Sequence, residues 1–212
     1  MTFDCYGTLI DWLSGARKAF TDLYPEMWDK ADLFIRYWGE KDWELVNIGV
    51  YRPYREILAD GFRYALERLG IAYSSETIRR LTYSIYDWKP FPDVREALEK
   101  LIEKGVELGI ISNTDRDFIM KSIEHIGVEF KHVIVAEDMK MYKPDPRVFK
   151  RAREILPEAR WIHVSSYPQY DIIPAYKAGV DTILLDRYGL SNELGDVKTV
   201  VIEDIRDLIK IV

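Results

Sequence analysis

Short apolar, β-branched runs alternate with amphipathic stretches through the second half of the chain. The apolar runs cover residues 106–112, 132–136, 161–166, 181–185 and 198–203. Between most of them, apolar residues recur at helical spacing, in 118–125, 146–156 and 171–178. Buried strands that alternate with helices are typical of α/β proteins with a doubly wound parallel sheet. We therefore expect this fold class, with Thr2 and Phe3 forming one further, very short strand.

A different, helical pattern fills residues 13–88. Apolar residues between 54 and 69 recur at helical spacing, and Ser75 is a candidate N-cap for a later helix. Another helix is expected to open with Pro92 near its first turn. The predicted organisation is a core domain, residues 1–12 and 89–212, interrupted after its first strand by a helical bundle, residues 13–88.

Aromatic residues concentrate in this bundle and its flanks, which hold five of the six tryptophans and nine of the fourteen tyrosines. Such rings either fill the core of a small bundle or line a pocket between the bundle and the core domain. The sequence leaves both interpretations open.

Composition narrows the function classes. The chain has 212 residues, 48% of them hydrophobic and 31% charged, which is typical of a globular protein. Its net charge of −6 gives no general attraction to nucleic acid or anionic membranes, and no apolar run is long enough to span a bilayer. No signal peptide is recognised, and the single cysteine, Cys5, favours a reducing cytoplasm. One glutamine and three asparagines against 66 charged residues suggest a heat-adapted source.

Polar clusters follow several predicted strands, where ligands bind in parallel α/β sheets. Asp4 follows the first strand, and residues 112–115, 142–146 and 165–171 lie at comparable places. Each cluster alone could be a helix cap or a solvated loop. Four clusters at one sheet edge predict a functional site.

The sequence of these clusters resembles the haloacid dehalogenase superfamily, in order and over nearly the whole chain. "DCYGTL" is similar to the family's first motif, with its aspartate nucleophile, and "ISNTD" to the second. "YKPDPRVF" resembles the lysine motif, and "HVSSYPQYDIIPA" the fourth, acidic motif. The helical insert resembles the small C1-type cap of one subclass. The resemblance implies a Rossmann-like core and a hydrolase.

The resemblance also implies roles for individual residues. Asp4 would attack carbon or phosphorus and form a covalent intermediate that water hydrolyses. Lys143 would hold Asp4 ionised, Asp171 would orient the water, and Thr8 and Ser112 would donate hydrogen bonds. Further candidates for substrate binding are Tyr6, Asn113, Ser166 and Arg36.

Two positions decide between phosphatase and dehalogenase chemistry. Phosphatases of this family carry a second aspartate where Tyr6 lies and a metal-binding acid where Ser166 lies. A Mg²⁺ site would retain only Asp4, the Tyr6 backbone carbonyl and Asp171. Asp-x-Tyr-Gly-Thr and Ser-Ser instead resemble the (S)-2-haloacid dehalogenases, whose halide leaves without a proton or a metal.

Three departures from the dehalogenase pattern keep alternatives open. Trp38 is followed by Gly39 where the resemblance implies a halide-binding arginine, Phe149 replaces a tyrosine, and Tyr167 an asparagine. The leading hypothesis is a dehalogenase without metal or cofactor. The alternatives are a Mg²⁺-dependent phosphatase of a small metabolite and a binding protein on a decayed enzyme scaffold. In each case we expect a small anionic ligand, and a homodimer is possible.

Overall fold

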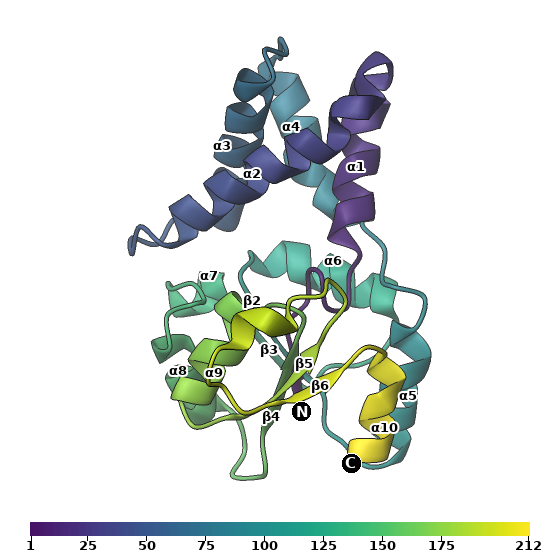
Figure 1. The fold of residues 1–212 in the computed structure, drawn as a ribbon, viewed down its shortest axis with the longest axis vertical. Helices are drawn as coiled ribbons and strands as arrows, with labels where there is room; N and C mark the ends of the chain where they lie inside the picture. The colour runs from purple at the N-terminus through teal and green to yellow at the C-terminus, as the bar shows by residue number, and fades with distance from the viewer.

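A six-stranded parallel sheet forms the centre of the core domain (Figure 1). The structure is a computed structural model that describes all 212 residues. The strands are β1 Thr2–Phe3, β2 Gly109–Ser112, β3 His132–Val135, β4 Ile162–Ser165, β5 Asp181–Leu185 and β6 Val200–Ile202, in the order β3-β2-β1-β4-β5-β6. This arrangement confirms the predicted doubly wound fold. Most strands are shorter than their apolar runs; the run at 106–112 starts three residues before β2.

Helices cover both faces of the sheet, because consecutive strand residues point to opposite sides. Ile110 packs with α5, α6 and α10, whereas Ile111 packs with α8 and α9. The core-domain helices are α5 Val94–Glu103, α6 Arg116–Ile126, α7 Ala136–Met139, α8 Arg147–Ile155, α9 Ile173–Lys177 and α10 Leu208–Ile211. Pro92 lies before α5, whose N-cap is Asp93, so the helix begins slightly later than predicted.

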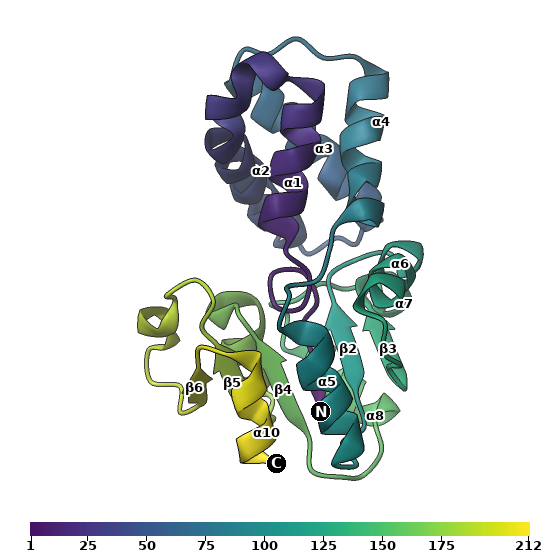
Figure 2. The same ribbon diagram turned by 90° about the vertical axis from the view of Figure 1, so that its right-hand side faces the viewer.

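Four helices form a separate bundle above the carboxyl ends of the strands (Figure 2). They are α1 Trp12–Leu23, α2 Ala31–Val46, α3 Tyr54–Arg68 and α4 Ser75–Tyr83, and the 3₁₀ turns Pro25–Lys30 and Ser84–Asp87 complete the bundle. We call this unit, residues 12–87, the cap. The N-cap of α4 is Ser74, not Ser75: the Ser74 hydroxyl accepts from the Thr77 amide, and the Thr77 hydroxyl accepts from the Ser74 amide. This reciprocal pair satisfies two otherwise free amides.

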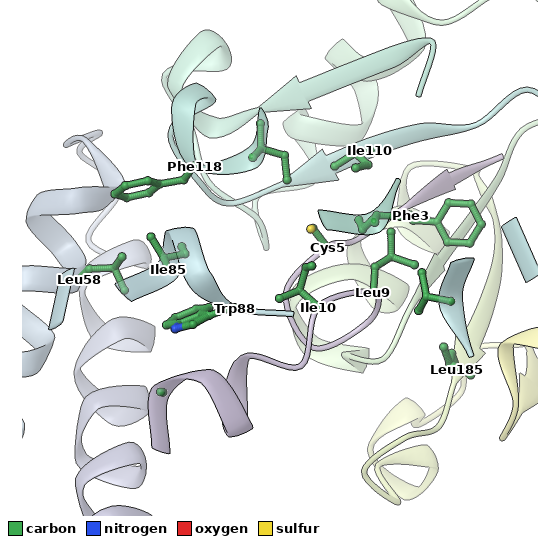
Figure 3. Close-up of a cluster of buried hydrophobic side chains, with 14 of the residues drawn as sticks. Phe3, Cys5, Leu9, Ile10, Leu58, Ile85, Trp88, Ile110, Phe118 and Leu185 are labelled. Carbon is green, nitrogen blue, oxygen red and sulfur yellow. The ribbon is translucent and has the colours of Figure 1, made fainter. Parts of the chain in front are cut away.

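Stacked rings fill the interior of the cap. Phe34 stacks on Phe20 and on Phe62, with ring centroids 4.6 and 5.7 Å apart, and Trp38 packs on Phe62 at 4.8 Å. The apolar cluster continues into the core domain, since Ile85 of the cap and the adjoining Trp88 lie near Ile10 and Phe118 of the core domain (Figure 3). The two domains therefore share one hydrophobic core, which opposes their separation in water.

A buried carboxylate fastens the cap to the core domain. Asp115, only 1% exposed, occupies the N-cap position of α6, but its side chain makes no hydrogen bond to that helix. Its oxygens accept hydrogen bonds from the Tyr54 amide at 2.7 Å and from the Arg55 amide at 3.0 Å. The Arg55 guanidinium adds an ion pair at 2.7 Å. A carboxylate of the core domain thus caps the start of α3, where free amides and the helix dipole favour negative charge.

No helix of the structure has the length and apolar character that crossing a membrane requires. Cys5 has a free thiol, which is buried.

Replacing Asp115 with alanine is expected to lower the free energy of unfolding by about 3 kcal/mol, because it leaves the Arg55 charge and two amides without their partner. The matched control is Asp117→Ala, which removes an exposed carboxylate that also pairs with Arg55. That change should cost about 1 kcal/mol or less. Urea unfolding of both variants measures the difference, and equal losses would show that Asp115 does not fasten the cap.

Candidate active site

A cavity of about 270 Å³ lies between the cap and the carboxyl ends of β1, β2 and β4. Its lining is mostly aromatic on the cap side and polar on the core side. The lining residues are Asp4, Tyr6, Trp12, Trp38, Gly39, Asp42, Trp43, Tyr54, Ile85, Trp88, Ser112, Asn113, Lys143, Tyr167, Tyr170 and Asp171. Both interpretations of the aromatic residues are therefore correct, since Phe20, Phe34 and Phe62 fill the bundle while four tryptophans face the cavity.

At the core side, the ammonium group of Lys143 bridges two carboxylates. Its Nζ donates to Asp4 Oδ1 at 2.8 Å, to Asp171 Oδ1 at 2.6 Å and to the Ile111 carbonyl at 2.9 Å. All three side chains are nearly buried, at 1% exposure for Lys143, 6% for Asp4 and 1% for Asp171. The three charged groups predicted from separate motifs therefore meet at one point.

The two carboxyl groups differ in their electrostatics. Burial raises the pKa of Asp4, the Lys143 charge lowers it and the Asp171 charge raises it, and the balance lies above the ordinary value. Burial also raises the pKa of Asp171, but Lys143 and a hydrogen bond from His163 outweigh it, and the pKa falls below the ordinary value. Burial lowers the pKa of Lys143, yet the two carboxylates raise it overall. Lys143 therefore stays charged while it holds both acids.

Thr8 orients the Asp4 carboxylate. Its hydroxyl donates to Asp4 Oδ2 at 2.9 Å and accepts from the Ser166 amide at 3.0 Å. The loop after β1 turns back on itself, since the amides of Leu9 and Ile10 both bond to the Cys5 carbonyl. This tight turn places Thr8 beside Asp4.

Ser112 and Asn113, both predicted to contact substrate, have different roles in the structure. The Ser112 hydroxyl is buried without a hydrogen-bond partner and lines the cavity, so it is free for a ligand. The Asn113 side chain instead bonds the Lys143 backbone, accepting from its amide and donating to its carbonyl, each at 2.8 Å. Asn113 therefore positions Lys143, which the sequence did not reveal.

Tyr6 lines the cavity with its ring but directs its hydroxyl elsewhere. The Ser122 hydroxyl donates to the Phe118 carbonyl, so the Tyr6 hydroxyl donates to Ser122 Oγ, at 3.0 Å. Burial raises the pKa of Tyr6 well above its ordinary value. This phenol is consequently not a proton donor for a bound molecule.

Gly7 makes room for Tyr167 at the edge of the cavity. Its φ of +92° is strained for other residues, and a Cβ would lie 2.3 Å from the Tyr167 hydroxyl. The same hydroxyl accepts from the Trp12 indole at 2.7 Å. Tyr167 thereby links the loop after β4 to the first helix of the cap.

His163, in β4, is a functional residue that the sequence analysis missed. It is fully buried, and its Nε2 lies 2.9 Å from Asp171 Oδ1 while its Nδ1 lies 2.9 Å from the Thr2 hydroxyl. The Trp161 indole donates to Thr2 at 2.7 Å, which directs the Thr2 proton to Nδ1. We assign the neutral tautomer with the proton on Nε2, because it satisfies every donor and acceptor in this chain. His163 thus donates a hydrogen bond to Asp171 Oδ1 and helps to fix the position of this carboxylate.

The predictions for Arg36 and Ser166 do not agree with their positions. The Arg36 side chain is 63% exposed, lies near Glu40 and does not line the cavity. Its place on the outer face of α2 follows from helical periodicity, because Trp38 occupies the inward face. Ser166 is buried and its hydroxyl has no hydrogen-bond partner, but it lies outside the lining of the cavity.

The cap contributes an acid to the cavity and no arginine. Asp42, in α2, lines the cavity close to Gly39, where the resemblance implied an arginine. Burial raises the pKa of Asp42 to about 6, although the nearby hydroxyl groups of Tyr54 and Tyr170 lower it. Sequence periodicity alone does not distinguish such an acid from a solvated one.

The donor groups at the core side do not suit Mg²⁺. Lys143 holds Oδ1 of both carboxylates, Thr8 holds Asp4 Oδ2, and only Asp171 Oδ2 remains without a partner. Mg²⁺ requires near-octahedral oxygen ligands, usually including one or two carboxylates. Residues of the metal-ligating types do not gather in a group of three or more anywhere in the structure. We therefore derive no step through a metal.

The arrangement of a buried Asp, Lys and Asp at one edge of a doubly wound sheet agrees with a family comparison. The sequence pattern of the haloacid dehalogenase-like hydrolases matches residues 2–185. The chain belongs to the haloacid dehalogenase-like hydrolase family. It is therefore a hydrolase, as predicted.

Several members of the haloacid dehalogenase-like family are similar over most of their length. (S)-2-haloacid dehalogenase H-109 of Pseudomonas putida is 30% identical, over 98% of this chain and 93% of the relative. Haloacetate dehalogenase H-2 of Moraxella sp. (strain B) is also 30% identical, over 92% and 89%. The crystal structure of the L-2-haloacid dehalogenase RSc1362 superposes with a TM-score of 0.88 at 27% identity, over 99% and 96% of the two chains.

Replacing His163 with phenylalanine is expected to raise the pKa of Asp171 by about one unit or more, because a hydrogen bond to the carboxylate is lost. Carboxyl ¹³C chemical shifts of labelled aspartate, followed against pH, measure the change. His163→Gln should restore much of the effect, since its amide can donate in the same place. An unchanged Asp171 pKa in the phenylalanine variant would contradict the assigned tautomer.

Proposed function

We propose that this hydrolase cleaves the carbon–halogen bond of small 2-halo acids, through an ester on Asp4 and without a metal or cofactor. The observation that carries the proposal is a prepared carboxylate with no free general acid at the position of Tyr6. Asp4 is held by Lys143 and Thr8, whereas the Tyr6 hydroxyl is committed to Ser122. Halide is a leaving group that departs without a proton. The names of the Pseudomonas and Moraxella relatives support the same chemistry.

In the first step, a carboxylate oxygen of Asp4 attacks C2 of the substrate. A carbon–oxygen bond forms, the carbon–halogen bond breaks, and halide leaves with the bonding electron pair. Attack from the side opposite to the halide inverts the configuration at C2. The free Ser112 hydroxyl is placed to donate to the substrate carboxylate, which orients C2 toward Asp4.

In the second step, water attacks the carboxyl carbon of the Asp4 ester. Asp171 lines the cavity and its Oδ2 has no other partner, so we assign this oxygen to accept the proton of the water. Lys143 and Thr8, which hold the two oxygens of the Asp4 carboxyl group, stabilise the negative charge that develops as water adds. The bond between the carboxyl carbon and the C2 oxygen then breaks, and Asp171 returns its proton to that oxygen, which releases the 2-hydroxy acid with C2 untouched. The Asp4 carboxyl group loses its remaining proton to water and is a carboxylate again.

Other features of the biology remain predictions. We propose a small anionic substrate that the protein meets in the cytoplasm, and we retain the heat-adapted source and the homodimer as expectations.

Incubation with (S)-2-chloropropionate is expected to release one chloride per (R)-lactate formed, measured by ion chromatography and chiral chromatography. Asp4→Ala should lower the rate by about 10⁴-fold or more, because the nucleophile is lost. The control Asp87→Asn alters an exposed acid of the cap and should leave the rate unchanged.

Isotope labelling sharpens this test. In a single turnover in H₂¹⁸O, the lactate hydroxyl should contain ¹⁶O from Asp4, because the water oxygen enters the carboxylate. Folded protein that releases no chloride from this substrate or from other short 2-halo acids would sink the proposal. Hydrolysis of phosphoesters that EDTA abolishes would favour the Mg²⁺-dependent phosphatase.

The rate should also rise with pH through the pKa of Asp4. Only the ionised carboxylate attacks, and burial raises its pKa, so kcat/KM should fall on acidification at a pH above 3.8. Lys143→Gln should move the residual activity to higher pH, because the charge that lowers the Asp4 pKa is removed. Asp42→Asn should retain the fall of kcat/KM on acidification, which would show that this fall arises from Asp4 and not from Asp42. A fall of kcat/KM centred at or below pH 3.8 would contradict a raised pKa of Asp4.

A further inference from the structure

Asp42 is a carboxyl group of the cavity that the proposed reaction does not use. Its Oδ1 is buried without a hydrogen-bond partner, and its Oδ2 accepts only a long bond of 3.5 Å from the Tyr170 hydroxyl. The neighbouring lysine, Lys41, pairs with Glu44 at 2.7 Å and lies over the Tyr64 ring instead. Asp42 therefore has no cation from the protein.

The cavity as a whole also lacks positive charge. Lys143 is the only cation among its lining residues, and Asp4 and Asp171 already share that charge. Asp42 adds a third carboxyl group at the opposite, cap side. A buried carboxylate without a partner is costly, so a complementary charge brought by a ligand would be bound favourably.

Aromatic rings surround the Asp42 side of the cavity. The ring of Trp43 meets that of Tyr170 edge to face at 4.7 Å, and both line the cavity with Tyr54. The faces of such rings attract cations, most strongly where water is excluded. Carboxylate and aromatic rings together favour a positively charged group over a neutral or negative one.

We propose that the cap side of the cavity is a subsite for an ammonium or quaternary ammonium group of the substrate, bound by Asp42 and the rings of Trp43, Tyr54 and Tyr170. This inference rests on the proposed function, since the halo acid end of the same molecule lies at Asp4. The enzyme would then prefer 2-halo acids with a cationic tail over simple haloalkanoates such as (S)-2-chloropropionate.

The charge state of Asp42 is suited to this role at neutral and higher pH. Its pKa is about 6, so the carboxylate is ionised at pH 8. The groups that face it are Tyr54 from α3, Tyr170 from the turn after β4 and, more distantly, Tyr142. Across the cavity lie Asp4, Asp171 and Lys143. None of these groups supplies a free cation to Asp42.

Isothermal titration with non-halogenated probes tests the subsite without turnover. The probes with a cationic tail, called cationic probes, are the zwitterions 4-(trimethylammonio)butanoate and 6-(trimethylammonio)hexanoate. Their counterparts of the same shape with an uncharged tail, called neutral probes, are the carboxylates 5,5-dimethylhexanoate and 7,7-dimethyloctanoate. At pH 8 we expect at least one cationic probe to bind the wild-type protein about tenfold more tightly than its counterpart. Equal binding, or preference for both neutral probes, would overturn the proposal.

Two variants show whether Asp42 causes the preference. Asp42→Asn keeps the shape and removes the charge, and should reduce the ratio of affinities to about one. Glu44→Gln removes an exposed charge from the same helix and should leave the ratio unchanged. If the asparagine variant retains the wild-type preference, the assignment to Asp42 is wrong. If it does not fold, the wild-type ratio still decides whether the subsite exists.

The outcome is separable from that of the proposed function. Chloride release from (S)-2-chloropropionate together with equal binding of charged and neutral probes would retain the dehalogenase and reject the subsite. Preferential binding of a cationic probe without release of halide from any 2-halo acid would reject the dehalogenase instead. The combined expectation is faster chloride release from (S)-2-chloro-6-(trimethylammonio)hexanoate than from (S)-2-chloro-7,7-dimethyloctanoate.

Discussion

One ammonium group shared by two buried carboxylates is the interaction on which the active site depends. Asp4 and Asp171 follow different strands, β1 and β4, and in a buried site their charges would repel strongly without Lys143. The lysine compensates the charges of both acids. The two acids are nevertheless unequal, because only Asp171 also has a hydrogen bond with His163. An attacking carboxylate and a water-activating carboxylate can therefore coexist within one small volume.

The sequence predicted that Asp4, Lys143 and Asp171 lie together, because Asp4 and Asp171 each follow an apolar strand and Lys143 lies in a recognisable motif. Parallel strands bring their carboxyl ends to one edge, so Asp4, Ser112 and the acidic turn at Asp171 had to be close. The helical bundle was equally visible from periodicity. The N-cap residue of α4 could not be predicted in the same way, because Ser74 and Ser75 have the same side chain and only the backbone geometry selects between them.

Partners distant in sequence could not be read from the pattern. Asp115 lies in the second motif and resembles an ordinary helix cap, but the amides that donate hydrogen bonds to it lie about 60 residues earlier, in α3. His163 sits in an apolar strand, where nothing local indicates that its ring meets Asp171. Arg36 was favoured by its charge, yet the phase of α2 turns it outward and turns Asp42 inward. Such facts depend on tertiary packing rather than on local preference.

The reacting groups and many of the residues on the cap side of the cavity belong to separate parts of the chain. Asp4, Lys143 and Asp171 are fixed by the sheet, whereas Trp38, Gly39, Asp42 and Trp43 all come from the single helix α2. Substitutions along one face of that helix can therefore change which molecules fit while the nucleophile and its lysine stay in place. Selectivity in this scaffold is a modular property, which mutation can diversify without rebuilding the chemistry.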